Sequence, residues 1–454
     1  MKPAITLAQH LAHAADRWPE GMALSTAAGE WTFAGLLEQA QATAAGLAAG
    51  SPPPILALAA DSRQLALAAY AGSAAGLTLW PLDPACAEQR WPAWQALAGR
   101  QARRLSELPA AGPAAPLAAA PADDLALVIA TSGSEGEPKA VMLSHGNLDA
   151  AAAAANRCLS LRPGDLWLAC LPLFHIGGLA ILWRCARAGA GVLLHDGFAA
   201  EAVAASLKEQ PVTHISLVPA MLARLLDLGA APPTTLRVTL VGGAALSATL
   251  YQRATAAGWP VLPTWGMSET AAQVATRLPA DGPWQEGDVG KPLPGNHVAV
   301  APDGRLRVAG PQLMLGYLNP ELRPGLGLAD GWLTTGDLGR LDDRGHLTIL
   351  GRADDMLVTG GSKVHPGEIE NGLAACPGVR DVAVTALPDP TWGDLVVALV
   401  VGTADAAAVE RWSREHLRPA ARPRRILHLD DLPRHANGKM DRAALRRLAA
   451  GARP

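Results

Sequence analysis

The chain has 454 residues, of which half are apolar and 17% are charged, so it can bury a large core. Its net charge of −3 excludes the basic character of a nucleic-acid-binding protein. Five cysteines without a CxxC pair indicate reduced thiols in a cytoplasmic protein rather than disulfides or a zinc site. Residues 1–21 lack the apolar core of a signal peptide, and the Ala-rich runs are too short to span a membrane.

The N-terminal third alternates short apolar runs with helical patterns, which is typical of βαβ units and a mostly parallel sheet. Residues 4–50 predict a helix, a short strand and a second helix, for which Thr32 is a candidate N-cap. The elements predicted next are strands at 55–60 and 77–82, a helix at 64–76 and a loop at 107–124.

A strand predicted at 125–130 leads into ATSGSEGEPKAVM, a stretch rich in glycine and hydroxyls with one lysine. Such a loop exposes N–H groups and hydroxyls that can hold a phosphate, and the lysine adds a point charge. A surface turn explains the composition equally well, because Gly, Ser and Pro are the ordinary loop residues. The candidate phosphate ligands are Thr131, Ser132, Gly133, Ser134, Gly136 and Lys139.

The βαβ spacing continues to residue 263, which predicts a second sheet or an extension of the first. The predicted strands are 166–171, 191–194, 214–218, 236–241 and 261–263, with helices from residue 145 and at 178–188, 199–209 and 219–228. From Asp288 the sequence pattern changes: Gly and Pro are frequent, and short segments alternate apolar and polar residues. This pattern indicates antiparallel β structure.

A small α+β unit follows residue 351, with strands at 356–358, 379–387 and 395–401 and helices at 366–375 and 404–417. We therefore predict an α/β fold. Residues 1–351 form a large domain of βαβ-type sheets with a small antiparallel β subdomain, and residues 352–454 form a small mobile α+β domain.

Six segments between residues 131 and 445 resemble, in order, the motifs of the adenylate-forming superfamily of acyl-CoA synthetases. They are TSGSEGEPKAVMLSHGNL, PLFHIGG, GGAA, TWGMSET, TTGDLGRLDDRGHLTILGRADDMLVTGGSKVHPGEIE and LPRHANGKMDRAAL. The resemblance implies an AMP-forming acid–CoA ligase that uses ATP, Mg²⁺ and coenzyme A. Its carboxylate substrate would attack the α-phosphate of ATP to give an acyl-adenylate, and a thiol would then give the thioester.

The resemblance also implies roles for the nucleotide-binding residues. Glu269 would be the magnesium ligand, and Ser268 would contact the α-phosphate. Trp265 stands where the family usually has Tyr, and its ring could stack on adenine beside Gly243, Ala244 and Gly266. Asp337 would accept both ribose hydroxyls, and Arg352 would reach the ribose or a phosphate. Without the resemblance, Glu269 is a helix N-terminal charge and Asp337 a turn carboxylate.

Further roles concern the C-terminal domain and the acid. Lys439, otherwise a surface lysine, would bridge the substrate carboxylate and the α-phosphate. Asp354 would be the hinge, and the loop of Gly361 would line the pantetheine tunnel. His175 would border the acyl pocket and gate the CoA channel. A histidine at a strand end is equally often a hydrogen-bonded polar group without a function.

Arg184 lies in an apolar helix, where it needs a partner, snorkels to solvent or binds a second carboxylate of the substrate. The region around it most resembles the o-succinylbenzoate–CoA ligases of menaquinone synthesis. Gly177, where that group often has Ser, and Glu135, beside the expected triphosphate, depart from the pattern. The hinge segment resembles aryl-CoA ligases such as those for halobenzoates just as closely.

Three alternatives stay open. The acid could be another aryl or fatty acid, the acceptor could be a carrier-protein thiol, and the chain could be a degenerate binding protein. Intact Glu269, Asp337, Arg352 and Lys439 argue against the last. The expected partners are a small carboxylic acid, ATP and CoA, without nucleic acid or a membrane span, and a homodimer is compatible with the sequence.

Overall fold

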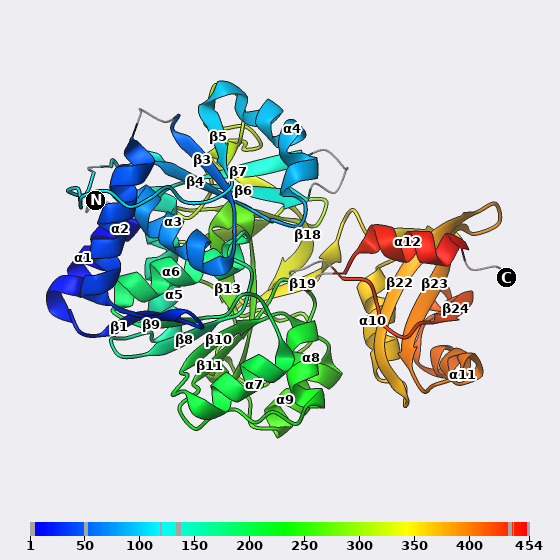
Figure 1. The fold of residues 1–454 in the computed structure, drawn as a ribbon. Coiled ribbons are helices and arrows are strands. Elements are labelled where there is room, and N and C mark those ends of the chain that lie inside the picture. The colour runs from blue at the N-terminus through cyan, green and yellow to red at the C-terminus, as the bar shows by residue number, and fades with distance from the viewer. Residues whose placement is uncertain are drawn as a thin grey trace.

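Two sheets organise the N-terminal part of the chain in the computed structural model, which describes residues 5–49, 53–118, 120–132, 138–434, 438 and 440–451 (Figure 1). The six-stranded sheet consists of β3 (Ile55–Ala59), β4 (Thr78–Leu82), β5 (Ala102–Leu105), β6 (Leu125–Ser132), β7 (Pro138–Ser144) and β17 (Gly316–Tyr317). Its order is β17-β7-β6-β4-β3-β5, parallel from β6 to β5 and antiparallel at the β17 edge.

The nine-stranded sheet is the second one that the βαβ spacing predicted. It consists of β1 (Met22–Thr26), β2 (Gly29–Thr32), β8 (Leu166–Ala169), β9 (Gly191–Leu194), β10 (His214–Leu217), β11 (Val238–Val241), β12 (Val261–Met267), β13 (Ala272–Thr276) and β14 (Lys291–Pro292). Its order is β14-β13-β12-β11-β10-β8-β9-β1-β2, and the strands from β12 to β1 are parallel. The carboxyl ends of β8, β10, β11 and β12 therefore meet at one edge.

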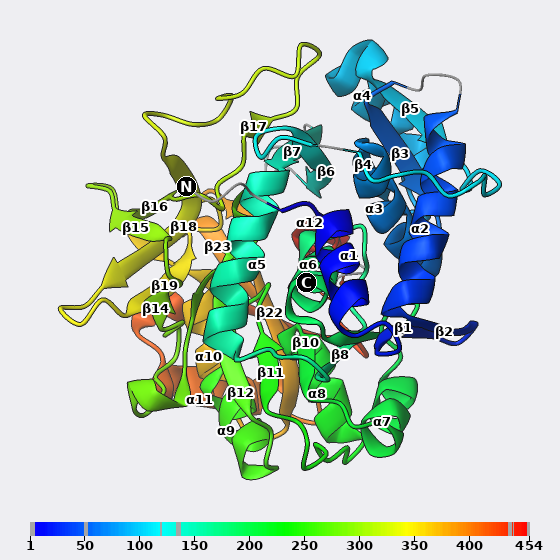
Figure 2. The same cartoon turned by 90° about the vertical axis from the view of Figure 1, so that its left-hand side faces the viewer.

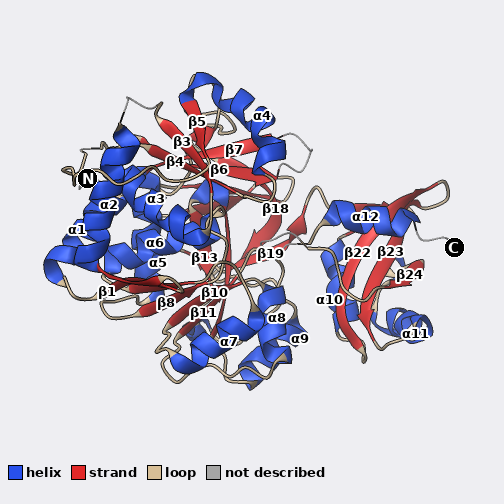
Figure 3. Ribbon diagram, in the orientation of Figure 1, coloured by secondary structure: helices blue, strands red, loops and turns tan. Residues whose placement is uncertain are grey.

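Helices fill the space between the two sheets and cover their outer faces (Figure 3). The inner helices are α1 (Leu7–Arg17), α2 (Phe33–Ala48), α3 (Ser62–Ala75), α5 (His145–Leu159) and α6 (Ile176–Ala188), which share one large apolar cluster with both sheets. The outer helices are α4 (Ala87–Ala98) on the six-stranded sheet and α7 (Ala200–Glu209), α8 (Pro219–Asp227) and α9 (Ala248–Ala256) on the nine-stranded sheet. An inner helix is apolar on most sides because it is buried on most sides, and α6 is buried at every position from 178 to 186.

The remaining elements form two smaller sheets. An antiparallel sheet of order β15-β16-β18-β19 contains β15 (His297–Val300), β16 (Arg305–Ala309), β18 (Leu333–Leu341) and β19 (Leu347–Arg352). The C-terminal sheet contains β20 (Leu357–Thr359), β21 (Ser362–Val364), β22 (Val379–Asp389), β23 (Gly393–Gly402) and β24 (Arg425–His428), with α10 (Pro366–Ala374), α11 (Ala406–His416) and α12 (Arg442–Gly451). When the left-hand side of Figure 1 faces the viewer, these C-terminal elements lie behind α5 and α6 (Figure 2).

Most predicted elements are present, and the capping prediction at Thr32 is confirmed, because its hydroxyl accepts the N–H of Gly35. One prediction was wrong: residues 138–142 were assigned to a loop but belong to strand β7. Val141 and Leu143 are fully buried and pair with β6, which explains the strand. Helices α4 and α9 and the short 3-10 helices η1 (Gly99–Gln101), η2 (Ser268–Thr270), η3 (Pro279–Asp281) and η4 (Pro419–Ala421) were not predicted.

Two further findings agree with the composition. In the part of the chain that the structure describes, no helix is both long and apolar enough to cross a membrane. All five cysteines are free.

Candidate active site

The predicted nucleotide-binding residues gather where the parallel strands of the nine-stranded sheet end. Gly243 and Ala244 follow β11 and are exposed, Trp265 and Gly266 lie near the end of β12, and Ser268 begins η2. Parallel strands present their carboxyl ends at one edge, so these segments are neighbours although they are distant in sequence. This edge is the frame of the candidate site.

A chain of contacts joins this edge to the antiparallel sheet. The indole Nε1–H of Trp265 donates to Oδ2 of Asp337 at 2.9 Å. The guanidinium of Arg352 lies 3.6 Å from Oδ1 of Asp337 and donates to Asp354 at 3.0 Å. The structure thus brings together the residues predicted for adenine, ribose and hinge, and Trp265 contacts Asp337 directly.

The Trp265 ring itself exposes little surface. It is 8% exposed and packs in an apolar cluster with Val274, Val289 and Leu306. Its N–H therefore reaches the Asp337 carboxylate, while most of the ring belongs to the core. An indole buried in this way is oriented by packing, and it fixes the carboxylate it bonds.

A second set of contacts surrounds Glu269 and includes a residue that the sequence did not reveal. The hydroxyl of Tyr317 donates to Oε1 of Glu269 at 2.9 Å. Burial and the neighbouring carboxylate raise the pKa of Tyr317, so its hydroxyl stays a donor at neutral pH. The ammonium of Lys139 lies 5.8 Å from the centre of the Tyr317 ring. Tyr317 and Glu269 are 48 residues apart, and no local pattern links them.

The Glu269 carboxylate fits a magnesium ion on its donor set. Tyr317 occupies Oε1, and no described residue donates a hydrogen bond to Oε2. Within the described ranges, no group of three or more His, Cys, Asp or Glu residues could hold a metal. Mg²⁺ commonly takes one or two carboxylates and completes its shell with phosphates and waters, which matches a single glutamate beside a triphosphate.

The phosphate loop is described only at its two ends. Thr131 on β6 and Lys139 on β7 are paired in register, and the Thr131 hydroxyl donates to the Lys139 carbonyl at 3.3 Å. Ser132 pairs with Pro138 as the last pair between β6 and β7. The remaining predicted loop ligands, Gly133, Ser134 and Gly136, lie outside the described residues, as do Glu135 and Lys439.

The C-terminal elements touch the edge of the nine-stranded sheet at Gly438. A Cβ added at Gly438 would lie 2.4 Å from a methyl group of Val218, so the Gly438 backbone sits directly against the end of β10. Arg224 of α8 lies 3.7 Å from Asp431. These contacts place the residue before Lys439 at the same edge as the nucleotide-binding residues.

The Gly361 loop is a tight hairpin on the C-terminal sheet. Gly360 and Gly361 both have positive φ, +55° and +76°, as a two-residue turn between β20 and β21 requires. Beside it lies an open hollow of about 500 Å³ whose lining includes Trp392, Arg418 and Arg424. The structure does not bring Gly361 into contact with the network of Asp337.

The two arginines that line this hollow, Arg418 and Arg424, have different partners. Arg418 makes two hydrogen bonds to Glu368, at 2.6 and 2.9 Å. The Arg424 guanidinium lies 4.0 Å from the centre of the Trp392 ring, and no carboxylate in the described part of the chain pairs with it. Arg424 is therefore a cation stacked on an aromatic ring and available to an anion.

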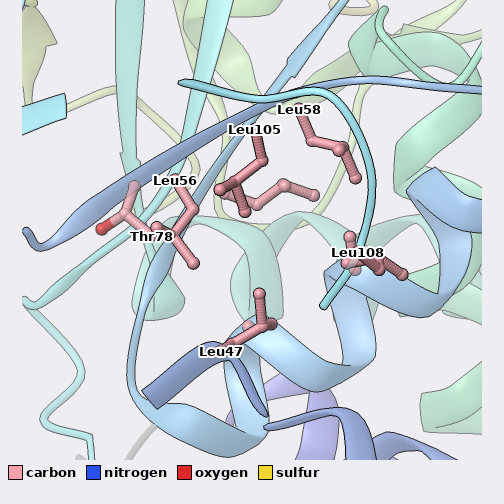
Figure 4. A pocket seen from close by; sticks show the side chains of 9 residues that line it. Leu47, Leu56, Leu58, Thr78, Leu105 and Leu108 are labelled. Carbon is pink, nitrogen blue, oxygen red and sulfur yellow. The ribbon is translucent and has the colours of Figure 1, made fainter. Parts of the chain in front are cut away.

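A second cavity belongs to the core and not to the site. It lies between α2, α3 and strands β3 to β5 and measures about 10 Å³, and six of its nine lining residues are leucines (Figure 4). An apolar space of that size holds one water at most, so it is a packing gap without a function.

His175 and Arg184 lie on the same helix but not at the same place. His175 is the N-cap residue of α6, half-buried, with its ring 4.8 Å from that of Phe174. At about 1.5 Å per residue, Arg184 lies roughly 13 Å further along α6. The structure therefore places His175 at the strand-end edge and Arg184 toward the other end of the sheet.

The surroundings of Arg184 exclude one of the three alternatives that the sequence left open for it. It is 3% exposed, so the prediction that it snorkels to solvent was wrong. Its guanidinium lies 5.4 Å from the centre of the Trp167 ring, and among the described residues no carboxylate lies within 4.0 Å of it. Burial lowers its pKa to about 10. Arg184 is thus a buried cation without an anionic partner in the described part.

Comparisons with known proteins agree with this geometry. Residues 92–318 match the AMP-binding enzyme family, and residues 368–439 match the AMP-binding enzyme C-terminal domain. A 2-succinylbenzoate–CoA ligase from Bacillus mycoides is 38% identical over 335 residues, which cover 71% of this chain and 69% of the relative.

Solved structures extend the similarity to the whole chain. The o-succinylbenzoate CoA synthetase from Bacillus subtilis in complex with an acyl-adenylate intermediate superposes with a TM-score of 0.85 at 29% identity, covering 100% of this chain and 99% of that one. The same enzyme in complex with ATP and a magnesium ion gives 0.86 at 29% identity, with coverages of 96% and 98%.

The buried charge of Arg184 leads to a stability prediction. We expect Arg184→Met to leave the free energy of unfolding unchanged or to raise it by about 1–3 kcal/mol, because the side-chain volume is kept and an unpaired buried charge is removed. Urea unfolding followed by circular dichroism measures this change.

Arg277→Met is the matched control. Arg277 is equally buried but pairs with Asp281 and Asp288, so its loss should cost about 3–5 kcal/mol. An equal loss in both variants would contradict the assignment of Arg184 as an unpaired cation.

Proposed function

Because the chain belongs to the AMP-binding enzyme family, a family of AMP-forming acid–thiol ligases, we propose that it converts o-succinylbenzoate into its CoA thioester at the expense of ATP. The observation that carries the proposal is the network of Trp265, Asp337 and Arg352 at the strand-end edge. It joins residues from two of the six segments that resemble family motifs, on a chain whose 38% identical relative is named for this substrate.

The nucleotide binds, in this proposal, across the edge where β11 and β12 end. Asp337 accepts the ribose hydroxyls, held in place by the Trp265 N–H. Lys139 and the loop between β6 and β7 bind the phosphates, and Ser268 contacts the α-phosphate. Glu269 holds the magnesium ion, which supplies positive charge at the triphosphate when bound.

The first chemical step brings together two anions, the substrate carboxylate and the α-phosphate. A cation at their meeting point offsets the repulsion and stabilises the charge that develops on the phosphate oxygens. We assign this role to Lys439, and the contact of its neighbour Gly438 with Val218 supports that assignment. His175, at the start of α6, borders the acyl group.

The second step uses a different placement of the C-terminal domain. We propose that residues 352–454 rotate as a unit against residues 1–351 about Asp354, which Arg352 holds at 3.0 Å in the arrangement described above. The rotation brings the hairpin at Gly361 to the site, where it lines the path of the thiol. Hinges of this kind consist of a few residues at element ends, as here directly after β19.

The hollow beside the Gly361 hairpin supports CoA as the acceptor, rather than a carrier protein. CoA carries an adenine ring and several phosphates beyond its thiol arm. A half-buried tryptophan and an exposed arginine without a carboxylate partner suit such a group, whereas a carrier domain needs a protein-sized contact surface. ATP and CoA are cytoplasmic substrates, so the proposal places the enzyme in the cytoplasm.

The choice of acid is tested by a pyrophosphate-release screen over aryl and fatty acids, with and without CoA. We expect o-succinylbenzoate to exceed benzoate by at least about a hundredfold in kcat/KM, because a second carboxylate adds a charge-assisted contact of about 3 kcal/mol. AMP should form together with the CoA thioester. A preference for benzoates or fatty acids would overturn the substrate assignment and keep the reaction type.

Arg184→Met enters the same screen as a probe of substrate reading. If Arg184 contacts the second carboxylate, as the sequence suggested, the preference for o-succinylbenzoate is lost. Its burial roughly 13 Å along α6 from His175 leads us to expect that the preference is kept.

Arg424→Ala tests the acceptor. We expect the KM for CoA to rise about tenfold, because one charge-assisted contact to a phosphate is lost, while pyrophosphate release without CoA stays unchanged. Arg414→Ala, which removes an exposed arginine on α11, is the matched control. An unchanged KM for CoA would remove this hollow from the CoA-binding surface.

Trp265→Phe separates two uses of the indole. A smaller aromatic ring replaces the indole and the N–H is lost, so the KM for ATP should rise about tenfold if Trp265 acts by holding Asp337. With 2′,3′-dideoxy-ATP, which has no ribose hydroxyls for Asp337 to bind, the same substitution should have little effect. Equal losses with both nucleotides would show that Trp265 acts on the base instead. Trp332→Phe serves as the control.

A further inference from the structure

We propose that Tyr317 is a positioning residue that aims Glu269 at the magnesium-bound triphosphate and keeps Lys139 free for the phosphates. The inference rests on the proposed function, which assigns Glu269 to the metal and Lys139 to the nucleotide. Tyr317 lies in β17, which belongs to none of the six segments that resemble family motifs. Three independent contacts carry it.

The first contact fixes the carboxylate. The Tyr317 hydroxyl donates to Oε1 of Glu269 at 2.9 Å, which leaves Oε2 for the metal. Glu269 lies in η2, a single turn that would otherwise allow its side chain several rotamers. A hydrogen bond to a charged acceptor is strong enough to select one of them.

The second contact fixes the tyrosine. Strand β17 pairs with β7, where Tyr317 faces Val141, and the N–H of Met314 donates to the Glu269 carbonyl at 2.8 Å. The segment thus holds the phosphate-loop strand and η2 by backbone bonds. Gly327 closes over the ring: a Cβ there would lie 2.5 Å from two ring carbons. The ring has little freedom to leave this position.

The third contact concerns charge. The Lys139 ammonium lies 5.8 Å from the Tyr317 ring centre, and Glu269 bonds the hydroxyl of the same ring. Among the described residues Lys139 and Glu269 form no ion pair. A direct pair would neutralise the two groups that must act on phosphate and metal. Tyr317 satisfies the carboxylate with a neutral donor and gives the ammonium an aromatic face, so both charges stay available.

The test measures binding rather than turnover. Calorimetry gives the factor by which saturating Mg²⁺ tightens ATP binding relative to ATP in EDTA. We expect Tyr317→Phe, which keeps the ring, to lower this factor about tenfold while ATP binding in EDTA stays as in the wild type. Tyr251→Phe is the matched control, since Tyr251 lies in α9, outside the site, and its ring stacks on that of Trp284. Thermal unfolding shows whether each variant is folded.

Glu269→Ala separates the inference from the function beneath it. If Glu269→Ala leaves the Mg²⁺ factor unchanged, the assignment of Glu269 to the metal fails. If Glu269→Ala lowers the factor and Tyr317→Phe does not, the positioning role of Tyr317 alone is overturned. Equal weakening of ATP binding by Tyr317→Phe with and without Mg²⁺ would mark the hydroxyl as structural and would also overturn it.

Discussion

The structure depends on hydrogen bonds from neutral aromatic donors that hold two carboxylates beside the site. Asp337 accepts such a bond from Trp265, and Glu269 accepts one from Tyr317. An N–H or O–H donor orients a carboxylate but leaves its anionic charge in place. At Glu269 the neutral donor acts without an ion pair among the described residues, whereas at Asp337 it acts beside Arg352, whose guanidinium lies 3.6 Å from Oδ1.

Each aromatic donor reaches its carboxylate because of the sheet that carries it. Trp265 stands near the end of a buried parallel strand, so its indole packs in the core and only the N–H extends toward β18. Tyr317 stands on an edge strand that pairs with the phosphate-loop strand β7. The two donors belong to different sheets. Asp337 lies on β18 of the antiparallel sheet, and Glu269 lies on η2, between β12 and β13 of the nine-stranded sheet. The site is thus a junction of three sheets, and its geometry follows from their packing.

Features that depend on residues close together in the sequence could be predicted, and features that depend on residues far apart could not. The N-cap at Thr32 is a local interaction, and it was predicted correctly. The ordered motifs identified the family for the same reason, since each is a short contiguous pattern. Strand β7 was missed because its first residues, Pro and Lys, look like a loop, and only pairing with β6 makes them a strand. Tyr317 was missed because its partner lies 48 residues away.

Arg184 shows how a sequence context can leave several interpretations of one residue open. An arginine in an apolar helix implies a partner, and a second substrate carboxylate was one candidate. The structure excludes solvent as its partner, because the side chain is 3% exposed. It offers one source of stabilisation, the Trp167 ring, which the guanidinium faces at 5.4 Å. That ring is not an anion, so among the described residues the charge is unpaired, and burial lowers its pKa to about 10. Burial could be read from an apolar helix, but the identity of the partner could not, because it depends on contacts far apart in sequence, and the second-carboxylate role stays a prediction.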